Sequence, residues 1–306
     1  MQAPCGSADV SLFGHGDKRF ELNEGHATTL SRLGTGPDTD SVLDGTARVP
    51  HPRRVAIIVY GPAEQEALRR AGDTAAATLA AVCERVESGI TTADIDRWVR
   101  EDTAARGATP SQLGFKGFPA AVCTSVNDVV CHGVPSPEVV LRDGDVINVD
   151  VTSCLGGFHG DTSRTLALGS IDADSRRVTE GAESCMWAGI EAVRPGARLG
   201  DIGAAIVGRA ADFGCAVVRE FGGHGIGRHM HMPPHVPHIG RAGTGIRLRP
   251  GMAFTIEPML TLTRVPLEVD TDAWTVRTMD GSPSAQFEHT VVVTESGVEV
   301  LTLPPA

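Results

Sequence analysis

The sequence predicts an α+β fold made of two related halves, each with a pair of helices followed by antiparallel strands. One observation is the alternation of apolar and polar residues over residues 146–152, which is typical of a half-buried strand and leads into a turn signal at Leu155-Gly156-Gly157. Another is a pair of helical patterns that occurs twice. A shift of 107 positions aligns the two pairs with eight identical residues, which indicates an internal duplication. The helical patterns cover residues 64–86, 92–105, 175–193 and 200–213.

The chain has 306 residues, of which 41% are hydrophobic and 21% charged, as in globular proteins with a sizeable core. Residues 1–52 are rich in Gly, Asp, Ser, Thr and Pro and show no sustained period. We therefore expect residues 1–52 to be a poorly ordered N-terminal extension and residues 53–306 to form the folded domain.

Charge and cysteine content limit the compartment and the partners. A net charge of −11 and the lack of a basic stripe argue against nucleic acid as the main partner. The seven scattered cysteines contain no CxxC pair, which favours a reducing compartment. We identify no signal peptide and no apolar run of roughly 20 residues. The sequence thus predicts a cytoplasmic protein that has no membrane partner.

Each helix of the first pair has its own start and stop signals. The first pattern places Leu68, Leu79 and other apolar residues at three- and four-residue steps, and it ends before Gly89. The second is predicted to open with Thr92 as the N-cap and to end at Gly107 as the C-cap.

The strand at residues 146–152 and the run that follows it form a predicted hairpin. If the chain folds back about Leu155 and Gly156, residues whose numbers sum to 311 face each other. Asp150 and Asp161 would then lie directly opposite on one face, with Cβ atoms roughly 5 Å apart. Two carboxylates this close resist joint ionisation, so we expect a shared proton or a cation between them. The alternative interpretation is a pair of solvent-facing strand charges.

Later segments each offer a polar residue at a strand or loop end. His132 stands just before a glycine, and His224 stands between two glycines, which let a backbone approach its neighbour closely. Glu257 ends a strand pattern because a proline follows it, and Glu288 lies in the last long strand pattern. The remaining histidines of the second region are interpreted as rim or surface residues: His229, His235 and His238.

Four carboxylates and one imidazole make a mostly hard, oxygen-rich set of candidate metal ligands. Such a set suits Mn, Fe(II), Co or Zn. It favours two divalent ions over one, because four negative charges would over-compensate a single ion. The candidate ligands are Asp150, Asp161, His224, Glu257 and Glu288.

Six motifs give the chain a close resemblance to the type I methionine aminopeptidases, peptidases of the pita-bread fold. The resemblance covers about residues 60–303 and implies an α+β fold with two pseudo-symmetric halves, an antiparallel sheet, helices outside and a metal site between the halves. It also implies that residues 53–306 are the catalytic domain. The matching motifs are CTSVNDVVCHGVP at 123–135, DGDVINVDVT at 143–152, GFHGDTS at 157–163, GHGIGRHMH at 223–231, GMAFTIEPML at 251–260 and SAQFEHTVVV at 284–293.

The resemblance implies a dinuclear metal centre that uses the same five residues. Asp150 would chelate one ion, and His224 would bind the other together with Glu257. Asp161 and Glu288 would bridge both ions. Only about 33 residues separate His224 from Glu257, which leaves no room for the helical insertion of type II enzymes.

The resemblance also implies removal of the N-terminal, initiator methionine from peptides whose second residue is small. A water between the ions would attack the carbonyl of the methionine, and Glu257 would shuttle its proton. His231 would stabilise the tetrahedral oxyanion, and His132 would hydrogen-bond the nitrogen of the scissile peptide bond.

An apolar, polarizable pocket is expected for the methionine side chain. The residues that match the family's lining positions, or lie beside them, are Phe115, Phe118, Cys123, Met230 and Trp274. The chain departs from the family's usual pattern at three positions, where relatives commonly have Phe, Glu and often Cys. These positions are Met230, Met232 and Gln112.

The partners that the resemblance implies are the N-terminal methionines of nascent polypeptides. A transient contact with the ribosome would fit this role, and Arg53-Arg54 could touch ribosomal RNA. The family is mostly monomeric, so we expect a monomer.

Three other functions are weighed against this one. An Xaa-Pro aminopeptidase or prolidase-like peptidase of the same fold usually carries a large N-terminal domain, which about 50 residues cannot supply. A non-catalytic pita-bread binding protein would be expected to lose ligands, whereas all five are present. A metal-storage protein that uses the histidine-rich segment would leave the separated carboxylates unexplained.

Overall fold

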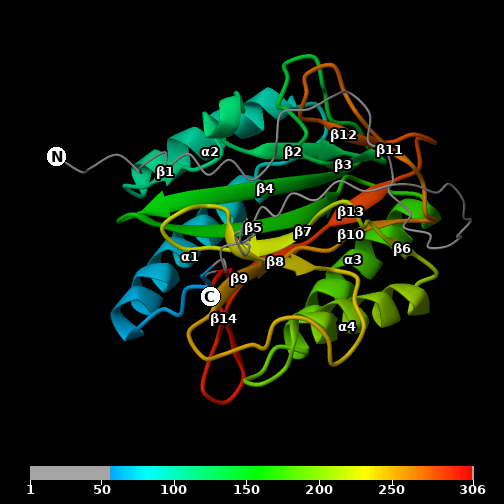
Figure 1. Ribbon diagram of the computed structural model, residues 1–306. Helices are drawn as coiled ribbons and strands as arrows, with labels where there is room; N and C mark the ends of the chain where they lie inside the picture. Colours follow the sequence, from blue (N-terminus) through cyan, green and yellow to red (C-terminus); the bar gives the residue numbers. More distant parts are fainter. Residues whose placement is uncertain (1–55, 305–306) are drawn as a thin grey trace, which may run out of the picture. The chain divides into compact units, whose positions relative to one another are not determined.

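The computed structural model describes residues 56–304, so the predicted extension of residues 1–52 lies outside the described part. The described chain runs through two helix pairs, each followed by strands, as the predicted duplication requires. Figure 1 shows α1 and α2 along one half of the central sheet and α3 and α4 along the other. The α-helices are α1 (Pro62–Cys83), α2 (Thr92–Ala105), α3 (Ala173–Glu191) and α4 (Leu199–Asp212). A short 3₁₀ turn covers Phe115–Gly117.

The four predicted helices are confirmed, with ends that differ by up to three residues. The predicted N-cap of α2 is wrong by one position, because Thr91 is the cap and Thr92 is the first helical residue. The Thr91 hydroxyl accepts from the Asp94 N–H, and the Asp94 carboxylate accepts from the Thr91 N–H. This capping box satisfies two backbone donors that the helix itself leaves free.

The central sheet has nine strands, and its core order is β1-β4-β5-β14-β9-β7-β8. β2 pairs with the edge of β4, and β15 pairs with β14. The contact between β5 and β14 joins the two halves of the chain. These strands are β1 (Thr109–Pro110), β2 (Cys123–Val126), β4 (Val146–Leu155), β5 (Phe158–Ala167), β7 (Gly222–Gly225), β8 (Met232–Pro237), β9 (Ala253–Ile256), β14 (Glu288–Val293) and β15 (Val298–Val300).

Two small sheets extend the fold beside the central one. One has the order β13-β10-β6 and the other β11-β12-β3. Their strands are β3 (Val129–Cys131), β6 (Ala216–Val217), β10 (Met259–Thr261), β11 (Leu267–Val269), β12 (Val276–Thr278) and β13 (Ser284–Gln286).

The helices cover the apolar face of the sheet. Leu79 of α1 and Ile95 of α2 pack in one cluster with Val149 and its apolar neighbours on β4. A second cluster joins Ile206 of α4 with Phe254 of β9 and the apolar residues of α3 and β14. The opposite face of the same strands is therefore left to the polar residues of the alternation.

The hairpin of β4 and β5 differs in register from the prediction. Asp161 pairs with Thr152, and Asp150 pairs with Ser163, so facing residues sum to 313 instead of 311. The reason is a two-residue turn at Gly156-Gly157, where both φ angles are positive (59° and 80°), as a type I′ turn requires. Because the observed register differs from the predicted one by an even number of residues, Asp150 and Asp161 stay on the same face. They are diagonal neighbours on the two strands instead of directly opposed residues.

The expectation of a half-buried β4 is also wrong. On its polar face Asn148 is 4% exposed and Thr152 is 1% exposed, so both faces of the strand are covered. The alternation therefore separates a helix-facing apolar side from a buried polar side.

A cavity of about 210 Å³ lies between α1 and α3, on the helix side of the sheet. Its lining includes Leu79, Met186 and Trp187. This cavity is separated by the sheet from the polar face.

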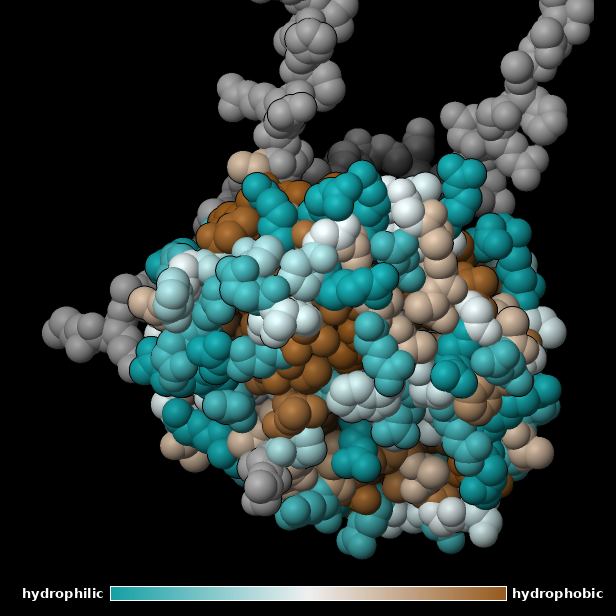
Figure 2. Space-filling view, turned by 90° about the horizontal axis from the view of Figure 1, so that it is seen from below, coloured by the Kyte–Doolittle hydropathy of each residue, from teal (hydrophilic) through white to brown (hydrophobic). Residues whose placement is uncertain are grey.

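Seen from below, hydrophilic residues cover most of the surface, and apolar surface is exposed mainly near the middle (Figure 2). Among residues 56–304, none of the helices combines the length and the apolar character that a membrane span needs.

The close approach of α1 to β5 predicts an asymmetry between two glycine substitutions. A Cβ at Gly160 would lie 2.5 Å from the Cα of Gly72, whereas a Cβ at Gly208 in α4 would meet no atom within 4 Å. We expect Gly160→Ala to lower the free energy of unfolding by about 1–3 kcal/mol through overpacking. Gly208→Ala should raise it by up to about 1 kcal/mol through helix propensity.

Urea denaturation of both variants in the presence of EDTA measures these changes. Equal effects of the two substitutions would show that α1 does not pack on β5 at this distance.

Candidate active site

The polar face of the central sheet carries two adjacent rows of side chains that cross five strands. In the first row, Asp150 on β4 faces Ser163 on β5, and Ser163 faces Glu288 on β14. His289 on β14 pairs with Ile256 on β9. The next position along both strands therefore sets Glu257 opposite Glu288. Three of the candidate ligands therefore come from one row across the sheet.

The second row contributes the other two candidate ligands. Thr152 on β4 faces Asp161 on β5, and Thr290 on β14 faces Thr255 on β9. Thr290 is joined to Asp161 by hydrogen bonds to both backbone groups of that residue. His224 of β7 completes the row, because its N–H donates to the Thr255 hydroxyl over 3.0 Å.

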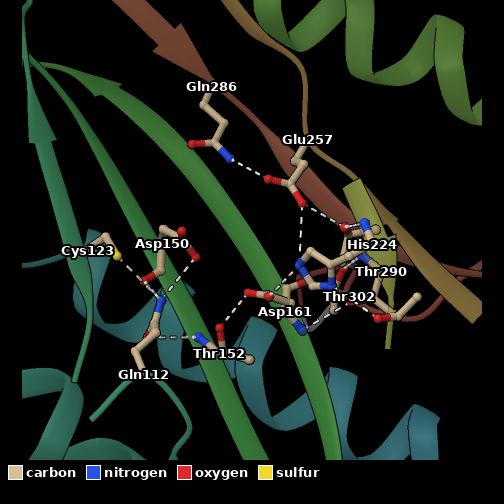
Figure 3. A network of polar contacts seen from close by, with 12 residues as sticks. Gln112, Cys123, Asp150, Thr152, Asp161, His224, Glu257, Gln286, Thr290 and Thr302 are labelled. Carbon is tan, nitrogen blue, oxygen red and sulfur yellow. Dashed lines mark hydrogen bonds and ion pairs between the residues drawn. The ribbon is translucent and has the colours of Figure 1, made fainter. Parts of the chain in front are cut away.

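All five candidate ligands thus meet on one face. Figure 3 shows four of them, Asp150, Asp161, His224 and Glu257. His224 Nε2 lies 3.6 Å from Asp161 Oδ2 and 3.5 Å from Glu257 Oε1. Asp161, His224 and Glu288 each offer a ligand atom, and these atoms lie within 4.8 Å of one another. Glu288 is 2% exposed, and its Oε1 has no hydrogen-bond partner in the described part of the chain.

The glycines beside His224 allow the crowding that the sequence predicts. A Cβ at Gly223 would lie 2.2 Å from the Thr255 carbonyl oxygen, and one at Gly225 would lie 2.2 Å from the Pro233 carbonyl oxygen. Only a residue without Cβ lets β7 lie this close to both neighbours.

Burial and mutual repulsion shift the titration of the carboxylates upward. Burial raises the pKa of Asp161 to about 7, against the hydrogen bond from Thr152, and raises the pKa of Glu257 to about 8. Burial and then the charge of Asp161 raise the pKa values of Asp150 and Glu288 well above their usual range. Burial lowers the pKa of His224 to about 4, so this imidazole is neutral near pH 7 and can act as a ligand.

The donor set fits divalent cations. Four carboxylates share one buried face with a neutral imidazole, and one carboxylate oxygen of Glu288 has no hydrogen-bond partner among residues 56–304. Buried carboxylates are normally paired with cations or metals, since an unpaired buried charge is costly. These residues could therefore hold a divalent metal.

A shell of hydroxyl and amide groups holds the carboxylates in place. The Thr152 hydroxyl donates to Asp161 Oδ1 over 2.7 Å, and the Thr255 hydroxyl donates to Glu257 Oε1 over 2.7 Å. Gln286 Nε2 lies 3.4 Å from Glu257 Oε2. No role was predicted for these residues, although the sequence holds a signal for them: each stands two positions from a candidate ligand on the same side of a strand pattern.

The interpretation of His238 as a rim or surface residue is wrong. His238 is 2% exposed, and its Nε2 accepts the N–H of Glu257 over 3.2 Å. Burial lowers its pKa to about 3, so it is a neutral acceptor that fixes the backbone at Glu257. His229 and His235, by contrast, are partly buried and exposed respectively.

The two histidines that are expected to bind the reacting peptide bond, His231 and His132, make different ring contacts. The His231 ring is 4.1 Å from the His224 ring and stacks on Phe115 at 5.0 Å. His231 is exposed, so it stands at the mouth of the site. His132 has a positive φ of 56° and an edge-to-face contact with Phe221 at 5.5 Å.

Part of the predicted methionine pocket forms one apolar cluster. Phe118 is 3% exposed and lies edge-to-face on Trp274 at 5.1 Å, and Cys123 belongs to the same cluster. Cys123 pairs with Asp150 across β2 and β4, so the cluster borders the carboxylate row. Met230 is buried but is not a member of this cluster, and Phe115 contacts His231 instead.

Comparison with known proteins gives a consistent family assignment. The model of metallopeptidase family M24 matches residues 66–295. Methionine aminopeptidase B of Synechocystis sp. is 47% identical over 270 residues, which covers 86% of this chain and 98% of that protein. The methionine aminopeptidase of Escherichia coli strain K12 is 41% identical over 250 residues, which covers 81% of this chain and 95% of that protein.

Solved structures agree with this assignment. The methionine aminopeptidase from Rickettsia prowazekii superposes with a TM-score of 0.79 at 42% identity, covering 81% of this chain and all of that one. The prolidase from Pyrococcus furiosus, at 19% identity and a TM-score of 0.63, shares the fold alone. The α+β pita-bread fold that the sequence predicts is confirmed by these matches.

The raised pKa values predict how the metal-free protein responds to pH. Glu257, with a folded pKa of about 8, keeps a proton in the folded state that it has lost in the unfolded state, where the pKa is about 4. Stability must then fall as pH rises through the folded pKa, by up to about 1.4 kcal/mol per pH unit for each such proton. A bound divalent ion removes this cost.

The melting temperature of metal-stripped protein, with and without saturating Mn(II), checks this expectation at about pH 7.5 and about pH 8.5. This range lies above the titration of histidines in the unfolded chain. We expect Mn(II) to raise the melting temperature more at the higher pH. An equal rise at both pH values would contradict the carboxylate cluster as the binding site.

Proposed function

The chain belongs to metallopeptidase family M24, and we propose that it removes the N-terminal methionine from peptides and nascent proteins whose second residue is small. The observation that carries the proposal is the meeting of five separated ligand candidates on one face of the sheet, next to an apolar cluster. Relatives that share 41–49% of their residues with this chain bear the name methionine aminopeptidase, which supports the choice of methionine.

Membership of a metallopeptidase family implies a divalent metal, and we propose two ions. Asp161 and Glu288, on the adjacent central strands β5 and β14, would help to hold these ions. Asp150 lies on one side of them, and His224 with Glu257 lies on the other. When bound, Co, Mn, Fe(II) or Zn ions would supply a hydroxide from water near neutral pH and would polarise the substrate carbonyl.

We propose that Glu257 moves the proton of the attacking water. Its Oε1 accepts the hydroxyl of Thr255, and its backbone N–H donates to His238, which supports one orientation of the carboxyl group. In the metal-free protein, burial raises the pKa of Glu257 to about 8. The same proton would then be delivered to the leaving amine.

His231 and His132 are proposed to bind the reacting peptide bond. His231 stands at the mouth beside His224, where an N–H can stabilise the oxyanion that develops on the carbonyl. His132 lies 6.4 Å from the Trp274 ring, on the side of the apolar cluster, and would hydrogen-bond the scissile nitrogen.

The apolar cluster accounts for the choice of side chain. Phe118, Cys123 and Trp274 offer aromatic rings and a thiol beside the carboxylate row, an environment that suits a thioether. Phe115 and Met230 would close the pocket from the side of His231. A free α-amine bound at the ions would restrict cleavage to the first peptide bond.

The setting of this activity is part of the proposal. Residues 53–306 would be the catalytic domain, because every candidate ligand falls within the described range of residues 56–304. The substrates would be nascent chains in the cytoplasm, met by a monomer in transient contact with ribosomes. An Xaa-Pro peptidase remains the second candidate, supported only by fold-level likeness to prolidases.

Peptide cleavage separates these two functions. Metal-stripped protein should gain activity on Met-Ala-Ser when Co(II), Mn(II) or Fe(II) is added, and Met-Leu-Ser should stay intact because its second residue is large. Release of methionine is measured by chromatography. Cleavage of Ala-Pro-Ser without cleavage of Met-Ala-Ser would transfer the assignment to the Xaa-Pro peptidases.

Two substitutions distinguish metal binding from oxyanion binding. Asp161→Asn should lose activity because metal is lost, as measured by metal analysis of the purified protein. His231→Ala should keep its metal while kcat falls by about 10²–10³-fold, since one oxyanion donor is removed. His229→Ala, in the same loop, is the matched control and should retain kcat. An unchanged kcat in His231→Ala would refute the oxyanion role.

A further inference from the structure

The edge of β4 has a gap beside the candidate metal ligands. β1 reaches β4 at Ser153, where Pro110 is its last paired residue. β2 pairs with β4 only from Asp150 toward the start of the strand. Between these two neighbours, the carbonyl of Asp150 and the N–H of Thr152 face an edge that neither strand covers.

The side chain of Gln112 fills this gap. Its Nε2 donates to the Asp150 carbonyl oxygen over 2.9 Å, and its Oε1 accepts the N–H of Thr152 over 3.3 Å. One residue of a parallel neighbouring strand would make the same two bonds with its backbone. Gln112 is 6% exposed, so water does not easily replace these bonds.

The same amide also reaches the candidate ligands themselves (Figure 3). The second N–H of Gln112 Nε2 is directed at Asp150 Oδ1, at 3.3 Å. Thr152, whose N–H is held by Gln112, donates its hydroxyl to Asp161 Oδ1 over 2.7 Å. One side chain is thus connected to both aspartates of the hairpin, directly to one and through Thr152 to the other.

We propose that Gln112 is a positioning residue that braces Asp150 directly, and Asp161 through Thr152, in the arrangement that binds the two cations. The inference rests on the proposed function only in taking these aspartates as metal ligands. A carboxylate oxygen has two lone pairs, so Asp150 Oδ1 can accept the amide N–H and still bind an ion.

The chemistry of the amide explains why this residue type suits the position. Only a carboxamide carries a donor and an acceptor in the arrangement of a peptide group. A cysteine or methionine at this position could offer neither strong donor nor strong acceptor. Thr290 and Thr165 also join strands through their side chains. The Thr290 hydroxyl bonds to the N–H and C=O of Asp161. The Thr165 hydroxyl bonds to the N–H and C=O of Gln286.

A role in the methionine pocket alone is the competing explanation. Gln112 Nε2 lies 3.9 Å from the Cys123 thiol, which borders the apolar cluster. A pocket residue would change the KM for the peptide, whereas a brace for the ligands would change the affinity for metal.

The test compares Gln112→Met with Gln65→Met. Both replace an amide by a side chain of similar length, and Gln65 loses a 2.7 Å bond to the Tyr60 carbonyl, which involves none of the candidate ligands. We expect Gln112→Met to raise the dissociation constant for Mn(II) by about 10–100-fold. An effect of this size is common when a residue that supports a metal ligand is removed. Titration calorimetry of the metal-stripped proteins measures this constant, and saturating Mn(II) should restore kcat with little change in KM. Gln65→Met should bind Mn(II) like the wild type.

An unchanged Mn(II) affinity in Gln112→Met would overturn the proposal, whether the variant shows a raised KM or only a lower melting temperature. If Gln112→Met does not fold, Thr152→Val tests the far end of the brace with a side chain of the same shape. Thr152→Val should also weaken Mn(II) binding by about tenfold or more, and wild-type affinity there would equally refute the brace. Wild-type protein that binds Mn(II) but releases no methionine would refute the proposed function and leave the brace standing.

Discussion

The register of five adjacent strands is the constraint on which this site depends. Asp150, Asp161, Glu288, Glu257 and His224 come from β4, β5, β14, the end of β9, and β7, which are consecutive neighbours in the sheet. Side chains in a strand alternate with a period of two, so a one-residue slip of β14 would turn Glu288 toward α3 and bring its neighbour into the site. The apolar clusters under α1 to α4 oppose such a slip, because it would expose their strand residues to the polar face.

Burial raises the pKa values of the carboxylates, and burying their charges also costs free energy of folding. The upward shifts of their pKa values arise first from burial and then, for Asp150 and Glu288, from the charge of Asp161. The fold offsets part of this cost with directed donors: Thr152 on Asp161 and Thr255 on Glu257. Within the described residues Glu288 keeps an oxygen without a hydrogen-bond partner, so part of the cost remains where a bound cation would remove it.

The sequence was sufficient to predict the helices, the shared face of the two aspartates and the five candidate ligands, because these depend on periodicity and on motif spacing. It was insufficient for the hairpin register, since Leu155-Gly156-Gly157 allows two turn positions and only the paired backbone shows that Gly156-Gly157 is the turn. His238 was misjudged for a different reason. Its burial depends on the contact with Glu257, and no local pattern contains the pairing of segments so far apart. Gln112 likewise acquires its partners only when β1 and β2 leave a gap along β4.

In the proposed function, β4 would connect recognition of the substrate with its hydrolysis. On its edge, Cys123 of the apolar cluster pairs with Asp150, and on its other side Thr152 faces Asp161. Any shift of β4 would therefore move the wall of the proposed methionine pocket and a candidate metal ligand together. Gln112 holds β4 with two hydrogen bonds from its side chain, in the gap between β1 and β2. A continuous neighbouring strand at this place would cover the proposed pocket. Since a displacement of about 1 Å in a reacting group can cost about 10²-fold in rate, this hold on β4 would matter for the proposed cleavage.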